Sequence, residues 1–166
     1  AGGWYTEILA PSLKAKGKTA ELAVLEATQI EPGRMVYVRQ QEPAGLGHAV
    51  WCARHVVGRE AFAVLLSDEL LWNPANPALK EMHAAYQRLG GNIISVLEVP
   101  AEHTHRYGIV SPGAVDGLIT EVKGLVEKPK PGTAPSRLAA IGRYILQPEV
   151  MDVLALGKRG AGNEIQ

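Results

Sequence analysis

Three apolar runs separated by helical patterns constrain the fold of this chain more than any other feature. The runs are Met35–Arg39, Phe62–Leu66 and Asn92–Val99, and apolar residues, many of them Val, Ile or Leu, fill most of their positions. Such runs are typical of strands that are buried on both faces. Helical patterns over His48–Val57 and Pro77–Leu89 lie between them. The alternation predicts an α/β fold with a mixed, mostly parallel sheet that is flanked by helices and joined by right-handed crossovers.

The second half of the chain has shorter strand candidates, separated by Pro-Gly, Asp-Gly and Gly signals. Asp116-Gly117 is a plausible hairpin turn between two of them. We expect these strands to add an antiparallel part at one end of the sheet, and a short helix to follow over Pro148–Leu156. The strand candidates are Tyr107–Val110, Leu118–Val122, Gly124–Glu127 and Ile141–Leu146.

The amino-terminal part of the chain is harder to interpret. Residues Ala1–Leu13 contain Gly, Trp, Pro and Ser without a clean period, and Lys14–Gln29 is mostly helical in composition. We therefore expect residues 14–166 to form one partial domain and residues 1–13 to be an unplaced segment.

Composition narrows the classes of function. A chain of 166 residues suits one α/β domain, and its 17 Lys and Arg balance its 17 Asp and Glu. This balance argues against binding to nucleic acid, which needs a basic surplus on one face. Cys52 is the only cysteine, so no internal disulfide is possible and a reducing compartment is the easier interpretation. Its side chain is most simply a small buried hydrophobe. Because no apolar run reaches the roughly 18 residues of a membrane span, we expect a cytoplasmic protein with no membrane partner.

The stretch Tyr37–Ala49 predicts a turn between a strand and a helix. Backbone N–H groups at such a turn lie at the carboxyl edge of a sheet, where open α/β folds bind nucleotides. Gln40 offers a donor and an acceptor together, which suits the edge of a base. Gly45-Leu46-Gly47 lacks the third glycine of the dinucleotide fingerprint, so a tight turn without a ligand is the alternative. His48 is interpreted as a residue that starts the helix.

Two further groups of charged residues follow strand candidates. Asp68 and Glu69 come after the second run and suit a divalent metal bound to phosphates, although a capping or turn aspartate explains Asp68 equally well. Glu127-Lys128-Pro129 places a carboxylate beside an ammonium group. A carboxylate accepts from paired sugar hydroxyls and lysine attracts phosphate. A surface ion pair is the commoner outcome for a Glu-Lys step.

With these pieces in order, the chain resembles the bacterial UTP–glucose-1-phosphate uridylyltransferases, a family of sugar nucleotidyltransferases. The resemblance runs from about Lys14 to Gln166. Its motifs are Val38-Arg39-Gln40, Gly45-Leu46-Gly47-His48-Ala49, Ala63-Val64-Leu65-Leu66-Ser67-Asp68, Tyr107-Gly108-Ile109-Val110, Gly124-Leu125-Val126-Glu127-Lys128-Pro129, Ala134-Pro135-Ser136, Ile141-Gly142-Arg143-Tyr144 and Gly162-Asn163-Glu164-Ile165-Gln166.

The resemblance implies a Rossmann-like fold and a reaction that forms UDP-glucose and pyrophosphate from UTP and glucose 1-phosphate. It implies that Gln40 and Gly45 contact uracil and that Asp68 is a ligand of Mg²⁺. Gly108 and Glu127 would contact the glucose, and Lys128 would bind phosphate as the catalytic lysine. A homo-oligomer is a further expectation from the family.

The chain also departs from the family pattern. The family's glycine-rich loop with Arg and Lys, which wraps the triphosphate, is not recognisable, the second metal-binding aspartate is not reached, and Ser67 stands where proline is usual. We therefore expect a fragment truncated at both ends, with little or no turnover by itself. The alternatives are a catalytically silent module that binds a sugar nucleotide, and a related thymidylyltransferase.

Overall fold

The computed structural model describes residues 5–31, 33–160 and 163–165, which form two compact units. The amino-terminal unit, Ala1–Val38, contains a π-helical turn η1 (Tyr5–Leu9) and the helices α2 (Ala10–Ala15) and α3 (Thr19–Ala27). Gly17, with φ of 64°, separates the two helices. The helical content predicted for Lys14–Gln29 is confirmed. The segment Ala1–Leu13, for which no element was predicted, contains η1 and the start of α2, while residues 1–4 lie outside the described part.

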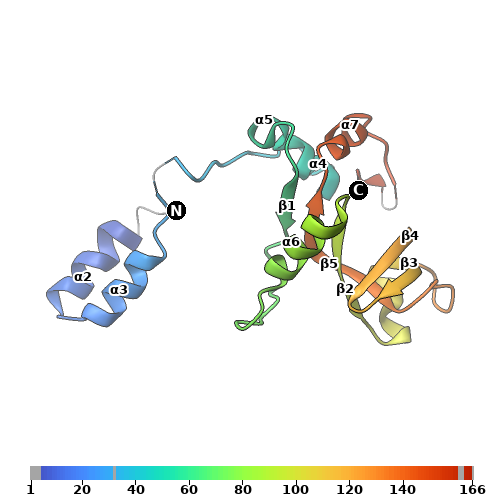
Figure 1. The fold of residues 1–166 in the computed structure, drawn as a ribbon. Helices are drawn as coiled ribbons and strands as arrows, with labels where there is room; N and C mark the ends of the chain where they lie inside the picture. The colour runs from blue at the N-terminus through green and yellow to red at the C-terminus, as the bar shows by residue number, and fades with distance from the viewer. Residues whose placement is uncertain (1–4, 32, 161–162, 166) are drawn as a thin grey trace. The chain divides into compact units, whose positions relative to one another are not determined.

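The main unit, Arg39–Gln166, carries a five-stranded sheet with helices around it (Figure 1). This confirms the predicted α/β class. Its elements, in chain order, are α4 (Leu46–Cys52), α5 (Arg54–Val57), β1 (Phe62–Leu65), α6 (Ala78–Leu89), β2 (Ile93–Glu98), the 3₁₀ helix η2 (Ala101–Arg106), β3 (Gly108–Asp116), β4 (Ile119–Glu127), β5 (Leu138–Leu146) and α7 (Glu149–Ala155).

Strand β5 is the centre of the sheet. It pairs with β1 and with β2, and Ile145 has a partner on both sides, Ala63 and Ile93. Its amino-terminal half also pairs with β3, through Ala139 and Ile109. These strands bury their apolar side chains in a core around Val99, Ile109 and Ala139.

The directions of the strands correct the expectation of a mostly parallel sheet. All pairings among the described residues are antiparallel. Strands β1 and β2 do run in the same direction, as a crossover through α6 requires, but β5 lies between them and runs the opposite way. Helix α6 packs against β2 and β5, and α4 packs against α7. The run Met35–Arg39 is a second correction, because it is exposed and pairs with no strand in the described part of the chain.

Local signals predicted the remaining elements well. Helix α6 begins after Pro77 and ends at Gly90, whose φ of 66° stops the helix, as the sequence indicated. Strands β3 and β4 form a hairpin in which Asp116 pairs with Ile119 across Gly117, at φ 60°. None of the helices in the described ranges has the length and apolar character needed to cross a bilayer.

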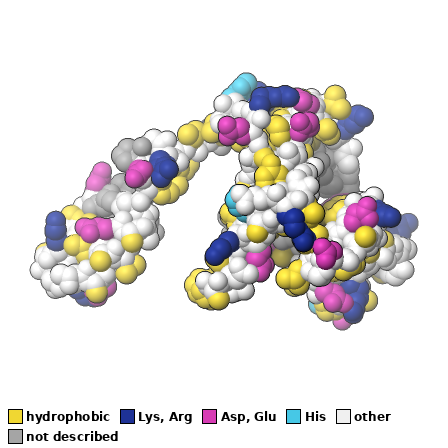
Figure 2. Space-filling view, viewed as in Figure 1, with side chains coloured by type: hydrophobic (Ala, Val, Ile, Leu, Met, Phe, Trp, Pro, Cys, Tyr) yellow, Lys and Arg dark blue, Asp and Glu magenta, His cyan; other side chains and the backbone are white. Residues whose placement is uncertain are grey.

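Large apolar side chains are exposed on the main unit (Figure 2). Leu70 and Trp72, which follow β1, are 82% and 79% exposed. Further apolar side chains are exposed on β4. The exposed residues on β4 are Val122, Leu125 and Val126.

Candidate functional site

The glycine turn before α4 is held by the carboxyl-terminal segment of the described chain. Ile165 donates its backbone N–H to Ala44 O and accepts from Gly47 N–H, both at 2.8 Å. Gly45 lies between these bonds with φ 107° and ψ 174°, a region that only glycine adopts readily. A Cβ at Gly45 would lie 2.6 Å from Ile165 O. The predicted tight turn is therefore present, and both its conformation and its packing require glycine.

Gln40 and Gly45 are brought together at this turn. The Gln40 side-chain Nε2 donates to Gly45 O at 3.1 Å and lies 2.9 Å from His48 Nδ1. Gln40 and His48 are both partly buried. His48, interpreted from sequence only as a helix-start residue, thus contacts the side chain that we expect to contact the base. Only the spacing of the two residues along the chain indicated this contact.

Asp68 lies in the loop that follows β1 and is exposed. Its carboxylate has no hydrogen-bond or ion-pair partner among the described residues, so an incoming ligand could reach it. Glu69, by contrast, accepts from the backbone N–H of Gly142 at 2.8 Å. The sequence did not distinguish the two acids, and the structure gives Glu69 the structural contact.

Arg143 fixes the loop that carries Asp68. Its guanidinium donates to Leu66 O at 2.9 Å, to Gly142 O at 2.8 Å and to Glu69 O at 2.6 Å. The backbone N–H of Leu66 donates to Gly142 O at 2.9 Å. Gly142 has to be small here, because a Cβ would lie 2.7 Å from Leu66 Cβ. Central strand β5 therefore positions the loop through a glycine and an arginine, neither of which was predicted as a site residue.

Gly108, Glu127 and Lys128 form a second group at the open end of the β3–β4 hairpin. Gly108 pairs with Glu127, and a Cβ at Gly108 would lie 3.0 Å from Glu127 Oε2. Lys128 Nζ is 3.5 Å from Glu127 Oε1. Lys128 has φ of 45°, and its N–H donates to Tyr107 O at 3.0 Å. The Glu127 side chain is 29% exposed and that of Lys128 61%, so both charged groups are accessible to a ligand.

The Tyr144 phenol lies within electrostatic reach of carboxylates from both the Asp68 loop and the Glu127 group. Burial raises the pKa of its phenol above 10.0, and the nearby carboxylates of Glu69 and Glu127 raise this pKa further. Two carboxylates from distant parts of the sequence therefore act on one half-buried phenol. Tyr144 was not predicted as a site residue, although it lies in the motif Ile141-Gly142-Arg143-Tyr144 and is a polar aromatic residue inside the apolar run Ile141–Leu146.

Asp68 is a candidate ligand for a metal ion, although it belongs to no cage of ligands among the described residues. No group of three or more His, Cys, Asp or Glu side chains gathers within the ranges that the structure describes. Asp68 alone nevertheless fits Mg²⁺, because this ion is usually held by one or two carboxylates together with substrate phosphates and water. The exposed carboxylate of Asp68, which has no ion-pair partner among the described residues, is the observation that favours this residue.

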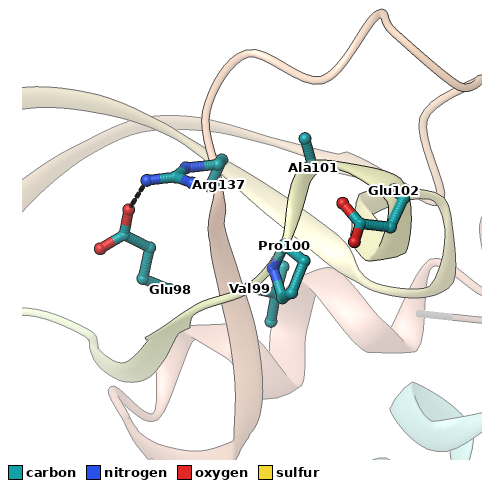
Figure 3. A pocket seen from close by; sticks show the side chains of 6 residues that line it. All are labelled: Glu98, Val99, Pro100, Ala101, Glu102 and Arg137. Atoms are coloured by element: carbon teal, nitrogen blue, oxygen red, sulfur yellow. Dashed lines mark hydrogen bonds and ion pairs between the residues drawn. The ribbon is translucent and has the colours of Figure 1, made fainter.

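A separate shallow hollow of about 470 Å³ lies where β2 meets η2 (Figure 3). Arg137 forms an ion pair with Glu98 on its wall. The opposite charges of this pair offset each other, and none of the predicted site residues reaches the hollow. The lining residues are Glu98, Val99, Pro100, Ala101, Glu102 and Arg137.

Comparison with known proteins gives consistent results. The family model described as nucleotidyl transferase matches residues 12–163. A UTP–glucose-1-phosphate uridylyltransferase of Staphylococcus haemolyticus is 49% identical over 154 residues, which cover 93% of this chain and 53% of that protein. The chain spans about half the length of the curated relatives that it matches.

The chain is also similar to solved structures. The crystal structure of a UDP-glucose pyrophosphorylase complexed with UDP-glucose is 40% identical, with a TM-score of 0.76, over 79% of this chain and 50% of that one. The structure of a UTP-bound UGPase from Acinetobacter baumannii is 37% identical, with a TM-score of 0.77, over 89% of this chain and 53% of that one. Nucleotidyl transferases generally use a divalent metal ion.

Proposed function

Because the chain belongs to the nucleotidyl transferase family, we propose that the protein transfers the uridylyl group of UTP to glucose 1-phosphate, which forms UDP-glucose and pyrophosphate. The observation that carries this proposal is the similarity of nearly the whole chain to UTP–glucose-1-phosphate uridylyltransferases. In the reaction, an oxygen of glucose 1-phosphate attacks the α-phosphorus of UTP. A new P–O bond forms while the bond from the α-phosphorus to the pyrophosphate leaving group breaks.

The glycine turn is the proposed site for uracil. Gln40 would contact the edge of the base with its amide, and Gly45 would let the backbone approach it closely. The fixed amide of Gln40, held against Gly45 O, supports its role. A bound sugar nucleotide would then extend from this turn towards the other predicted site residues.

The hairpin end is the proposed site for glucose and phosphate. Glu127 would accept from glucose hydroxyls, and the backbone of Gly108, which pairs with Glu127, would contact the glucose ring. Lys128 would bind the phosphate and stabilise the charge that develops on it. The exposed side chain of Lys128, whose Nζ lies 3.5 Å from Glu127 Oε1, supports this role.

Asp68 is the proposed ligand of Mg²⁺. Asp68 would hold the ion, which when bound would supply positive charge to offset the negative charge of the phosphates. The role of this chain is to hold the Asp68 loop still, which Arg143 and Gly142 do through hydrogen bonds to its backbone.

Three further proposals concern the domain bounds, the cellular compartment and the oligomeric state. We assign residues 14–166 to one partial nucleotidyl transferase domain and leave residues 1–13 unassigned, which the family match over residues 12–163 supports. A cytoplasmic protein is supported by the one cysteine, Cys52, which is free. A homo-oligomer is supported by the exposed apolar side chains of the main unit.

The experiment that tests this function compares Lys128→Gln with Lys123→Gln in the full-length protein. Both lysines are exposed and each lies near a glutamate, so the pair is matched in charge and setting. We expect Lys128→Gln to lower kcat for pyrophosphate release roughly 100-fold or more, because a phosphate-binding charge is lost. Lys123→Gln should retain wild-type turnover. Removal of the metal with EDTA should abolish turnover, and added Mg²⁺ should restore it.

Three outcomes would count against the proposal or its details. Equal turnover of the two lysine variants would refute the role of Lys128. A full-length protein that binds UDP-glucose without turnover would favour the silent module. Preference for dTTP over UTP would favour the thymidylyltransferase alternative.

A further inference from the structure

We propose that His48 is a positioning residue, which fixes the orientation of the Gln40 amide so that the site accepts uracil and rejects cytosine. This inference rests on the proposed function, because it concerns the base of the nucleotide that the site would bind. Gln40 is the residue that would contact the base, and His48 acts only through Gln40.

The orientation of the amide follows from its two neighbours. Gly45 O can only accept a hydrogen bond, so the Gln40 side-chain atom 3.1 Å from it must be the NH₂ group. The same nitrogen lies 2.9 Å from His48 Nδ1. An NH₂ group has two hydrogens, and the second is therefore available to His48 if Nδ1 is unprotonated. His48 then carries its proton on Nε2.

This arrangement leaves a defined atom of Gln40 for the base. With both hydrogens of the NH₂ group used inside the protein, the amide oxygen is the group left to meet a ligand. An oxygen accepts the N3–H of uracil but repels the N3 lone pair of cytosine. Reversal of the amide would place its oxygen against Gly45 O and His48 Nδ1, which are both acceptors. His48 thus adds a second penalty against the orientation that would suit cytosine.

The His48 ring is itself held in place. It stacks on Trp51 with a centroid distance of 6.0 Å and an angle of 23° between the planes. Arg54 lies over the other ring of this stack, 3.6 Å from the Trp51 centroid. Cys52 Sγ lies 3.9 Å from His48 Nε2, where it can serve as a weak acceptor for the proton on that nitrogen. The stack holds the ring in place, and the contact with Cys52 is compatible with the tautomer that Gln40 needs.

The experiment measures the dissociation constants of UTP and CTP for the full-length protein and for two variants. His48→Phe keeps an aromatic ring for the stack on Trp51 but removes the acceptor. His48→Asn keeps an acceptor oxygen at a position equivalent to Nδ1. We expect His48→Phe to reduce the preference for UTP over CTP by about tenfold, the value of one hydrogen bond, mainly through tighter binding of CTP. His48→Asn should retain most of the wild-type preference, and the same changes at exposed His55 should leave it unchanged.

An unchanged preference in His48→Phe would overturn the inference, since a merely structural histidine would alter both affinities together. A long-range ¹H–¹⁵N spectrum of the wild-type protein gives a test that needs no variant, because it shows which ring nitrogen is protonated. A proton on Nδ1 of His48 would also overturn the inference. If the wild-type protein bound neither UTP nor UDP-glucose, the proposed function itself would fail, and this result is distinct from both of the others.

Discussion

The contact between Gly142 and Leu66 gives the sharpest prediction about the Asp68 loop. In Gly142→Ala the new Cβ would lie 2.7 Å from Leu66 Cβ, whereas ordinary contacts begin at about 3.4 Å. Because Leu66 Cβ is attached directly to the backbone, a change of rotamer does not relieve the clash. The loop must move, and this strains the hydrogen bonds that join Leu66 to Gly142 and Arg143, both 2.9 Å long.

The magnitude follows from two opposing terms. Overpacking of this kind costs about 1–3 kcal/mol, and replacing glycine by alanine inside a strand returns about 0.5–1 kcal/mol. We expect Gly142→Ala to lower the free energy of unfolding by about 1–2 kcal/mol. The control is Gly124→Ala in β4, where the new Cβ would meet only Ser111 atoms at 3.7 and 3.8 Å. This control should be neutral or slightly stabilising.

Displacement of the loop in Gly142→Ala should also reduce turnover. Asp68 lies two residues after Leu66, and a displacement of catalytic groups approaching 1 Å can reduce turnover up to about 100-fold. Urea unfolding and the Mg²⁺ dependence of UDP-glucose formation, both in the full-length protein, measure the two effects. If Gly142→Ala unfolded and turned over like Gly124→Ala, the argument that Gly142 positions the Asp68 loop would be refuted.

Two further predictions concern the glycine turn and Tyr144. Gly45→Ala should weaken UTP binding at least tenfold and destabilise the protein by about 1–3 kcal/mol, because the backbone is strained and the new Cβ clashes with Ile165 O. Calorimetry measures UTP binding in this variant and in the control Gly117→Ala, because Gly117 has a positive φ but open space around it. Equal effects of the two substitutions on UTP binding would exclude the clash as the cause. Since burial and nearby Glu69 and Glu127 raise the Tyr144 pKa, stability from the neutral phenol is present below about pH 10 and is lost as the pH rises towards the raised pKa. The free energy of unfolding should therefore decrease more between pH 8 and pH 10.5 in the wild-type protein than in Tyr144→Phe. Equal decreases in the two proteins would contradict this.

Local sequence signals determined the helices, the hairpin and the candidates for the site. Pro77 and Gly90 bound α6 because proline suits a helix start and glycine adopts the positive φ that ends one. Asp116-Gly117 marked the hairpin for the same kind of local reason. The motifs that contain Gln40, Gly45, Asp68, Gly108, Glu127 and Lys128 also indicated the family, which the family match confirms. All of these signals lie within a few residues of the feature that they predict.

Only the tertiary structure decided the features that depend on distant partners. The place of β5 between β1 and β2, and hence the antiparallel sheet, follows from pairings across about 80 residues of chain, which periodicity does not encode. The same strand brings Gly142 and Arg143 to the Asp68 loop and places the Tyr144 phenol near Glu69 and Glu127. The contact of Ile165 with the glycine turn likewise joins opposite ends of the main unit. Sequence identified which residues carry charge or lack a side chain, and folding decided which of them meet.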